Sequence, residues 1–510
     1  MNRTIICLAA AALVLGLSAC SSNGPNKTDS TGTATAAAPL TMKALQAATT
    51  GQFQPVPLPD PKITGYRFPE KEEVIVGWTK SDNRQAIELH GWGIWTSLMA
   101  DSGESFEGQK LRVFETWYDP SDLSSTGTAT PLAAGQRRVR NPRRLQIPRQ
   151  FEHGGRKLLA AQVPTNGEST VLAFVKYDPS ASDHILKNNL FSAAQLSSLL
   201  KSGSAAVSDF PDTSVSLKPV FRPLAASQLV AGRYFQLKSW PGSPNLTLDP
   251  ADQMWHSKPF PSSAWGQCVW IDVQDVARKP GTGVDRTCSA NGASRTDANT
   301  YGVDEFVNFK LSQAEAAAVN SQLKANDPTS TSVTAAGNYA VLVAMHVTSR
   351  EITRWTWQTY WWTYQPDRPF APSSPAVAAE RPAQLTGAAR HYAQCTAYQE
   401  VKPVQPNTGG SNTGESVYCF NPYLEAPFDP SVLPDSQPGM TTVNAKLVKT
   451  PNDVGAQTNC MSCHEQANFN PNNIPTAPNY TGDRYVDLNS PAFKGVLKAD
   501  FLWSIPGNAH

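Results

Sequence analysis

Residues 339–348 read Tyr-Ala-Val-Leu-Val-Ala-Met-His-Val-Thr, a nearly continuous run of apolar side chains. A run of this length, rich in β-branched residues, predicts a strand that is buried on both faces of a sheet. His346 is the exception in the run, because a buried imidazole needs a hydrogen-bond partner or a metal. Side chains alternate between the two faces of a strand, so Met345 is expected to point away from His346. The stretch therefore predicts a central strand with one candidate functional side chain.

The segments around this run predict more strands than helices. The predicted helices cover residues 85–99, where apolar residues recur at three- and four-residue steps, as well as 192–200 and 312–323. The last of these opens with Ser312 and Glu315 as a capping box. The predicted strands are rich in β-branched and aromatic residues and cover 111–118, 169–177, 233–240, 266–273 and 305–311. The aromatic cluster at 355–364 is typical of a further strand whose rings pack in the core. We therefore expect an α+β fold, dominated by β structure, with a sandwich-like body.

Near the C-terminus the chain reads Cys460-Met461-Ser462-Cys463-His464, a C-x-x-C-H sequence. This is the attachment signal for a c-type haem, in which two thiols bond the porphyrin and the histidine binds the iron. A zinc site would need a second ligand pair, and no other C-x-x-C or H-x₃₋₅-H pattern exists in the chain. A redox C-x-x-C would need a thioredoxin-like βαβ pattern, which is missing. The sequence therefore predicts one covalent haem c on Cys460 and Cys463, with His464 as the proximal iron ligand.

The N-terminus predicts export. Arg3 precedes an apolar run over residues 5–17, which is too short to span a bilayer, and Leu-Ser-Ala-Cys follows at 17–20. This order is typical of a secretory signal, so residues 1–19 are expected to be removed. The tetrapeptide resembles a bacterial lipobox, which implies that Cys20 carries a lipid and anchors the protein to a membrane. Serine rather than aspartate follows Cys20, which favours the outer membrane over the inner one.

Four cysteines then remain, and an even number in an exported protein indicates two disulfides. The simplest pairing is sequential, Cys268–Cys288 and Cys395–Cys419, but four cysteines allow three pairings. The alternative is four buried free thiols. Export agrees with the haem motif, because c-type haem is attached on the outer side of the bacterial inner membrane. We therefore expect a lipoprotein of the cell envelope that faces the periplasm.

The length of the chain predicts more than one packed unit. Residues 20–60 are rich in Ser, Thr, Ala and Pro and predict a flexible tether. A main β-rich domain is expected over 61–370, and the Pro-rich stretch 371–382 separates it from a haem-bearing segment at 383–510. The 43 Lys and Arg nearly balance the 42 Asp and Glu, which argues against nucleic acid as a partner.

Six arginines between residues 137 and 149 form the densest charge run. This run predicts either a docking surface for an acidic redox partner or anionic lipid, or a solvated loop with local ion pairs.

The haem segment differs from an ordinary class I cytochrome c domain. Those domains place a Met ligand well downstream of the motif, whereas no Met and only the terminal His510 follow His464. A sixth iron ligand must therefore come from upstream, or the iron keeps an open position. His346 is either a core histidine with a hydrogen-bond partner, an iron ligand, or a distal acid and base. His391 and Met440 are the other candidates for the sixth ligand.

Several motifs resemble those of uncharacterised exported bacterial proteins identified as "cytochrome c family". The resemblance rests on the block at 459–467 and on Ala-Asp-Phe-Leu-Trp at 499–503. It also rests on His346-Val347 followed by the W-x-W-x-T segment at 355–359, and on Phe-Glu-Thr-Trp at 114–117. It implies a haem-binding exported protein and supplies no reaction.

Three functions are compatible with these features. The first is a membrane-tethered mono-haem protein that transfers electrons to a partner protein in the periplasm. The chain is much longer than the ~100 residues of a compact domain. The second function is therefore a haem peroxidase or oxidase with an open iron position and a distal histidine. The third is a non-catalytic binding or gas-sensing haem lipoprotein.

Overall fold

The computed structural model describes residues 51–124, 138–147, 171–243, 248–249, 254–255, 259–275, 278–411, 413–427, 440–443, 446–449, 459–472 and 484–510. The predicted signal peptide, Cys20 and the first part of the predicted tether lie outside these residues. None of the described helices is long and apolar enough to cross a membrane.

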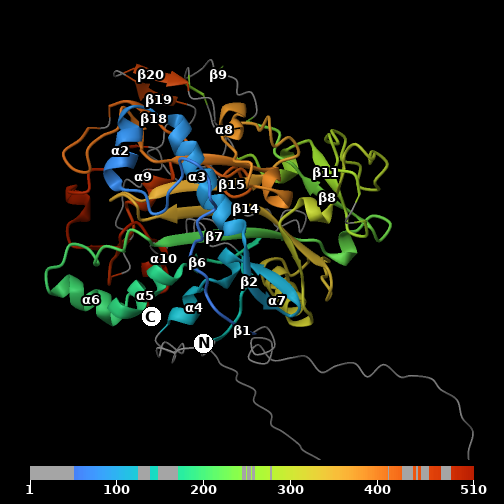
Figure 1. Cartoon of the computed structure of the whole chain (residues 1–510), viewed down its shortest axis with the longest axis horizontal. Coiled ribbons are helices and arrows are strands. Elements are labelled where there is room, and N and C mark those ends of the chain that lie inside the picture. The colour runs from blue at the N-terminus through green and yellow to red at the C-terminus, as the bar shows by residue number, and fades with distance from the viewer. Residues whose placement is uncertain are drawn as a thin grey trace, which may run out of the picture. The chain divides into compact units, whose positions relative to one another are not determined.

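A seven-stranded antiparallel sheet runs through the described part of the chain (Figure 1). Its longest strand, β14 (Tyr339–Ser349), pairs along one edge with β7 (Val215–Pro223). Along its other edge β14 pairs first with β13 (Asn308–Lys310) and then with β15 (Thr356–Trp362). Beyond these, β16 (Tyr392–Ala397) pairs with β15, and β5 (Leu172–Ala173) and β6 (Lys176–Tyr177) pair with β7. The predicted central strand is confirmed, because β14 is buried along most of its length.

The register of the ladder decides which side chains share a face of this sheet, since directly paired residues point the same way. One face carries a row that crosses the four strands β7, β14, β15 and β16 and consists of Lys218, His346, Thr359 and Cys395. The adjacent row on the opposite face consists of Pro219, Met345, Tyr360 and Gln394. Met345 therefore points away from His346, as the alternation predicts.

Helix α3 (Arg84–Met99) covers the Met345 face of the sheet and is drawn in blue across β14 and β15 in Figure 1. The Tyr360 hydroxyl donates to Gly91 O at 2.6 Å, and the Tyr360 ring stacks on Trp95 at 4.3 Å. A Cβ at Gly91 would lie 2.8 Å from Gln394 Oε1, so glycine lets the helix approach the sheet closely. The opposite face is left for C-terminal residues, which form the site described below.

Small sheets and short helices surround this core. The other helices are α2 (Glu72–Lys80), α4 (Pro120–Leu123), α5 (Pro179–Asn188), α6 (Ala193–Lys201), α7 (Gln313–Asn326), α8 (Pro375–Ala379), α9 (Cys460–His464) and α10 (Ser504–Gly507). A three-stranded sheet consists of β8 (Tyr234–Lys238), β11 (Cys268–Asp272) and β12 (Thr300–Gly302). Two-stranded sheets pair β1 (Gly51–Phe53) with β4 (Arg138–Arg140), β2 (Asp101–Phe106) with β3 (Gln109–Arg112), β9 (Leu248–Asp249) with β10 (Met254–Trp255), β17 (Val401–Lys402) with β18 (Glu415–Ser416), β19 (Met440–Val443) with β20 (Lys446–Lys449), and β21 (Asn468–Phe469) with β22 (Leu497–Lys498). The fold is a mixed α+β arrangement in which strand pairing outweighs helix, as predicted.

The three predicted helices are confirmed as α3, α6 and α7. The α7 capping box forms as expected, because Ser312 Oγ accepts from Glu315 N at 3.1 Å and Glu315 Oε2 accepts from Ser312 N at 2.8 Å. The strand predicted over 111–118 is wrong, because β3 ends at Arg112 and a 3₁₀ turn, Val113–Thr116, follows. Polar side chains close this turn, since the Glu115 carboxylate accepts from Arg112 N at 2.9 Å.

The predicted division at 371–382 stays a prediction, but parts of the predicted segments share one sheet. β16 belongs to the predicted haem segment and pairs along its whole length with β15 of the predicted main domain. At the other end, residues 51–60 of the predicted tether pack on the body. Val56 N donates to Thr116 Oγ1 at 2.9 Å, and Trp117 Nε1 donates to Val56 O at 2.7 Å.

Candidate functional site

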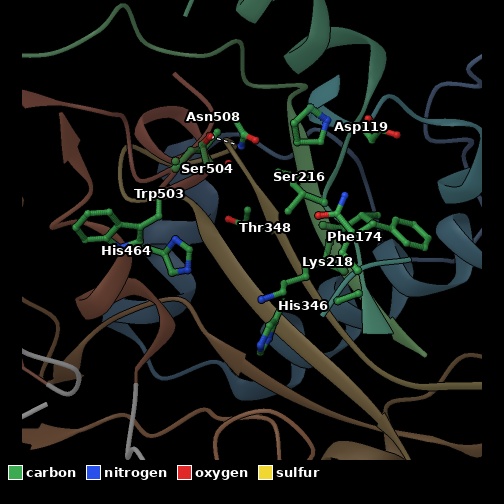
Figure 2. Close-up of a pocket in the computed structure, with 18 of the residues that line it drawn as sticks. Asp119, Phe174, Ser216, Lys218, His346, Thr348, His464, Trp503, Ser504 and Asn508 are labelled. Carbon is green, nitrogen blue, oxygen red and sulfur yellow. Dashed lines mark hydrogen bonds between the residues drawn. The ribbon is translucent and has the colours of Figure 1, made fainter. Parts of the chain in front are cut away.

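A cavity of ≈ 630 Å³ opens between the His346 face of the sheet and the C-terminal residues that cover it (Figure 2). One wall holds the predicted haem residues Cys460, Cys463 and His464. In Figure 2, His464 and Trp503 lie on one side of the cavity, whereas His346 and Lys218 rise from the strands on another side. The structure thus brings the C-x-x-C-H motif and the predicted upstream histidine to the same cavity.

The wall with the motif is the short helix α9, and Asn459 fixes where this helix begins. Asn459 Oδ1 accepts from Ser462 N at 3.2 Å, which is an N-cap bond. Asn459 Nδ2 donates to Gln399 O at 2.8 Å and to Val417 O at 2.6 Å. The side chain is fully buried, so it ties α9 to two other segments without water. The start of the helix that carries the thiols is therefore fixed by bonds from Asn459 to Ser462 within the helix and to Gln399 and Val417 outside it.

His464 presents its Nε2 atom as the nitrogen that can bind iron. Its Nδ1 lies 2.8 Å from Phe501 O, and a carbonyl oxygen can only accept, so Nδ1 carries the proton. The ring of Trp357 packs on the imidazole at 4.1 Å between centroids. Burial, with smaller contributions from the nearby His346 and Lys218, lowers the pKa of His464 to about 3. The imidazole is therefore neutral at neutral pH, as an iron ligand must be.

His346 projects from β14 into the same cavity. Its Nε2 lies 3.1 Å from Glu425 Oε1, and its side chain is 22% exposed although its neighbours on the strand are buried. Figure 2 places His346 next to Lys218, its ladder partner on β7. The carboxylate satisfies the hydrogen-bonding need of the buried imidazole, and the exposed part of the ring faces the cavity. His346 thus has the hydrogen-bond partner predicted for a core histidine, and its role toward haem stays a prediction.

The cavity suits a covalent haem in several ways. Its volume lies within the range of about 300–1,000 Å³ typical of small-molecule and cofactor sites. Phe174, Leu502 and Trp503 provide apolar wall area for a macrocycle. Two cationic side chains on the lining, Lys218 and Arg144, would form ion pairs with the haem carboxylates. Arg144 Nε also donates to Asp119 Oδ2 at 3.2 Å. The two thiols and the neutral imidazole of His464 complete a donor set for haem c.

His391, a second candidate ligand, does not line this cavity in the described part of the chain. His391 lies at the end of the 3₁₀ turn Gly387–His391, with its Nε2 3.4 Å from Glu305 Oε2. Burial, together with the charges of Arg381 and Arg390, lowers the pKa of His391 to about 4. Met440 begins β19, and its side chain lies outside the described atoms. The predicted role of His391 as a sixth ligand therefore gains no support, and that of Met440 stays a prediction.

One predicted disulfide is confirmed. Cys268 and Cys288 are bonded beside the three-stranded sheet of β8, β11 and β12. The second bond, Cys395–Cys419, is not formed in this structure, where both residues are buried thiols. The Cys395–Cys419 bond stays a prediction.

The arginine run is buried at two of its described members, whereas a third, Arg144, is partly exposed. Arg140 and Arg143 are both buried, and Arg143 Nε donates to Glu115 Oε1 at 2.7 Å. The guanidinium of Arg140 lies over the rings of Phe53 and Tyr118 at 4.4 Å. The prediction of local ion pairs is right for this part, and the prediction of a solvated loop is wrong for it. Arg137 and Arg149 lie outside the described residues.

Several site residues were missed from the sequence. Glu425, Lys218 and the Phe501 carbonyl reach the site only through tertiary contacts, and no local pattern marks them. Asn459 had a signal, because asparagine directly before a short helix is a typical N-cap.

No protein-family model matches the chain, and no curated protein or solved structure shows a match to it.

Proposed function

We propose that the chain is a membrane-tethered, mono-haem c-type redox protein that transfers electrons. Its haem would be bonded to Cys460 and Cys463, with His464 as the proximal ligand. One observation carries the proposal: both thiols, the neutral imidazole of His464 and a second imidazole, His346, line one cavity. When bound, haem iron accepts and returns one electron. The chain supplies the attachment, the ligand orientation and an enclosure of mixed polar and apolar side chains.

This arrangement would not be an ordinary class I cytochrome c domain. The wall that holds the motif is a five-residue helix, and it faces a seven-stranded sheet. The second imidazole comes from a strand far upstream, in place of a methionine downstream. We therefore propose that His346 would supply the sixth iron ligand, with Glu425 orienting its ring through the 3.1 Å contact.

The optical spectrum tests whether this iron site is closed. We expect ferric and ferrous protein, matured in a host able to attach haem c, to be low-spin and indifferent to cyanide and carbon monoxide. We expect His346→Ala to become high-spin and to bind carbon monoxide, because it removes the only described histidine side chain besides His464 and His510 on the cavity lining. His391→Ala is the matched control and should keep the wild-type spectrum, since His391 pairs with Glu305 elsewhere.

A high-spin wild-type spectrum that shifts on adding ligand would contradict electron transfer through a closed site. It would favour the second function, a haem enzyme of the peroxidase or oxidase type. The contact between His346 Nε2 and Glu425 supports this alternative, because a carboxylate-bound imidazole is well suited to proton transfer. In that case His346→Ala should lower turnover with peroxide and a reducing substrate.

The membrane anchor is proposed from the sequence alone. We expect Cys20→Ala to move the protein from the membrane fraction to the soluble envelope fraction, because the lipid would have no attachment point. Fractionation of cells followed by immunoblotting measures this shift, and Cys7→Ala serves as the control. Unchanged membrane association of Cys20→Ala would refute lipidation.

A further inference from the structure

Three thiols from distant parts of the chain meet beside the candidate haem site. Cys395 lies on β16, Cys419 follows β18, and Cys460 begins α9. Burial raises the pKa of the Cys419 thiol, and the thiols of both other residues lie near enough to raise it further. Cys460 Sγ also lies 3.5 Å from Cys419 O, and Cys395 Sγ lies 3.7 Å from Tyr418 O. Cys419 is thus the shared neighbour of Cys395 and of a haem-attachment thiol.

The surrounding hydrogen bonds hold this cluster in place. Asn459 Nδ2 donates to Val417 O at 2.6 Å, which joins the start of α9 to the stretch before Cys419. After Cys419, Asn421 Nδ2 donates to Thr359 Oγ1 at 2.8 Å, and Thr359 is the ladder partner of Cys395. Cys419 is fully buried and Cys395 is 5% exposed. The chain on both sides of Cys419 is therefore fixed, one side to the haem helix and the other to the sheet.

A disulfide joins two sulfur atoms at about 2.05 Å, so only a thiol that lies beside Cys419 can pair with it. Cys419 has two such neighbours, but one sulfur can form only one disulfide. A bond to Cys395 leaves the Cys460 thiol available for haem, whereas a bond to Cys460 blocks it. The two pairings are mutually exclusive and have opposite consequences for haem attachment.

We propose that Cys395 and Cys419 form a protective pair that keeps Cys460 reduced for haem attachment. The inference rests on the proposed function, because it takes Cys460 as a haem-bonding residue. A Cys419–Cys460 disulfide is the competing product, and Cys395 resolves it. The pair thereby raises the fraction of the protein in which the Cys460 thiol is free to bond haem.

The chemistry needs one oxidation and one exchange. A disulfide-bearing oxidant takes two electrons from a pair of these thiols, and its own disulfide is reduced to two thiols. If Cys419 and Cys460 are joined first, the Cys395 thiolate attacks Cys419 Sγ. The Cys395–Cys419 bond forms as the Cys419–Cys460 bond breaks, and Cys460 leaves as a thiolate that takes up the proton released by Cys395. No further oxidant is required in the exchange.

Disulfide mapping and haem loading test the proposal together. In wild-type protein we expect non-reducing peptide mapping to find Cys395 joined to Cys419. In Cys395→Ala we expect Cys419 joined to Cys460 in much of the protein, and covalent haem per chain reduced several-fold. The double variant Cys395→Ala/Cys419→Ala should regain wild-type loading, because the competing thiol is gone. Cys288→Ala is the control, since it frees a thiol, Cys268, in a separate sheet, and should load normally.

The double variant separates this mechanism from misfolding, because it contains the same Cys395→Ala change. Equal haem loading in Cys395→Ala and wild-type protein, with Cys395 and Cys419 both alkylated as free thiols, would overturn the proposal. So would a double variant that loads as poorly as the single one. If no variant takes up haem, the proposed function fails instead. The mapping still decides the thiol pairing in that case, because it reads the disulfides of the haem-free chain.

Discussion

We expect the double variant Cys460→Ala/Cys463→Ala to retain no haem that survives denaturing electrophoresis. Both thiols line the cavity beside His464, and they are the two side chains of the motif that can bond a porphyrin covalently. Without them, any haem would be held only by His464 and by packing, and denaturant would release it. Haem-dependent peroxidase staining of the gel measures the effect, which should be complete.

A matched control removes two other cysteines. Cys268→Ala/Cys288→Ala deletes the disulfide beside β11, in a different sheet from the cavity. This variant should be less stable, because a native disulfide contributes about 2–5 kcal/mol. The folded fraction should nevertheless keep its covalent haem. A haem stain that persists in the Cys460→Ala/Cys463→Ala protein would contradict covalent attachment at this motif.

The second large effect is expected at Arg354, which holds the haem helix to the body. Its Nη1 contacts Glu400 and Glu465, the residue that directly follows His464. Its Nη2 donates to Asn407 O at 2.9 Å and to Val486 O at 3.0 Å. The guanidinium and both carboxylates are buried. Arg354→Leu should lower the free energy of unfolding by about 3–5 kcal/mol, because it leaves buried carboxylates without their cation.

The loss in Arg354→Leu should depend on pH. Burial raises the pKa of Glu465 well above its usual range, nearby Glu400 adds to this shift, and Arg354 opposes it. Removing the arginine raises this pKa further, so the folded variant binds a proton that the unfolded chain releases. The folded variant therefore gains stability relative to its unfolded state as the pH falls from neutral towards about 5. Denaturant unfolding at pH 7 and pH 5 measures both the loss and its partial recovery.

Neutral carboxyl analogues provide the control for Arg354. Arg354→Leu/Glu465→Gln/Glu400→Gln removes the unpaired charges and should recover part of the lost stability at pH 7. If Arg354→Leu lowers the free energy of unfolding by less than about 1 kcal/mol, the effect matches an exposed ion pair. That result would contradict the role of Arg354 in holding the haem helix to the body.

The sequence predicted the elements whose signals are local. β14 is apolar along its length, and α7 carries its capping box within four residues, so both were found. β7 was missed because Lys218, Pro219 and Pro223 interrupt its apolar pattern, although it pairs with β14 over nine positions. The 3₁₀ turn at 113–116 has the sequence pattern of a strand, since the buried Val113 and Phe114 fit either conformation.

The residues of the candidate site also fall into two groups, those with a local sequence signal and those without one. Cys460, Cys463 and His464 are adjacent in sequence, and their chemistry follows from their spacing. His346 was identified because a histidine in an apolar strand needs a partner. That partner, Glu425, comes from a loop 79 residues further along the chain and has no local signature. The Phe501 carbonyl that orients His464 is likewise set only by tertiary packing.

The most direct test of the central claim is the mass of the tryptic peptide that spans residues 450–484. The protein should be matured in a host that attaches haem c, with a known c-type cytochrome as a positive control. The account predicts one haem on this peptide, bonded through Cys460 and Cys463. Unmodified thiols or a Cys460–Cys463 disulfide in the wild-type peptide, from a host that matures the control cytochrome, would contradict it.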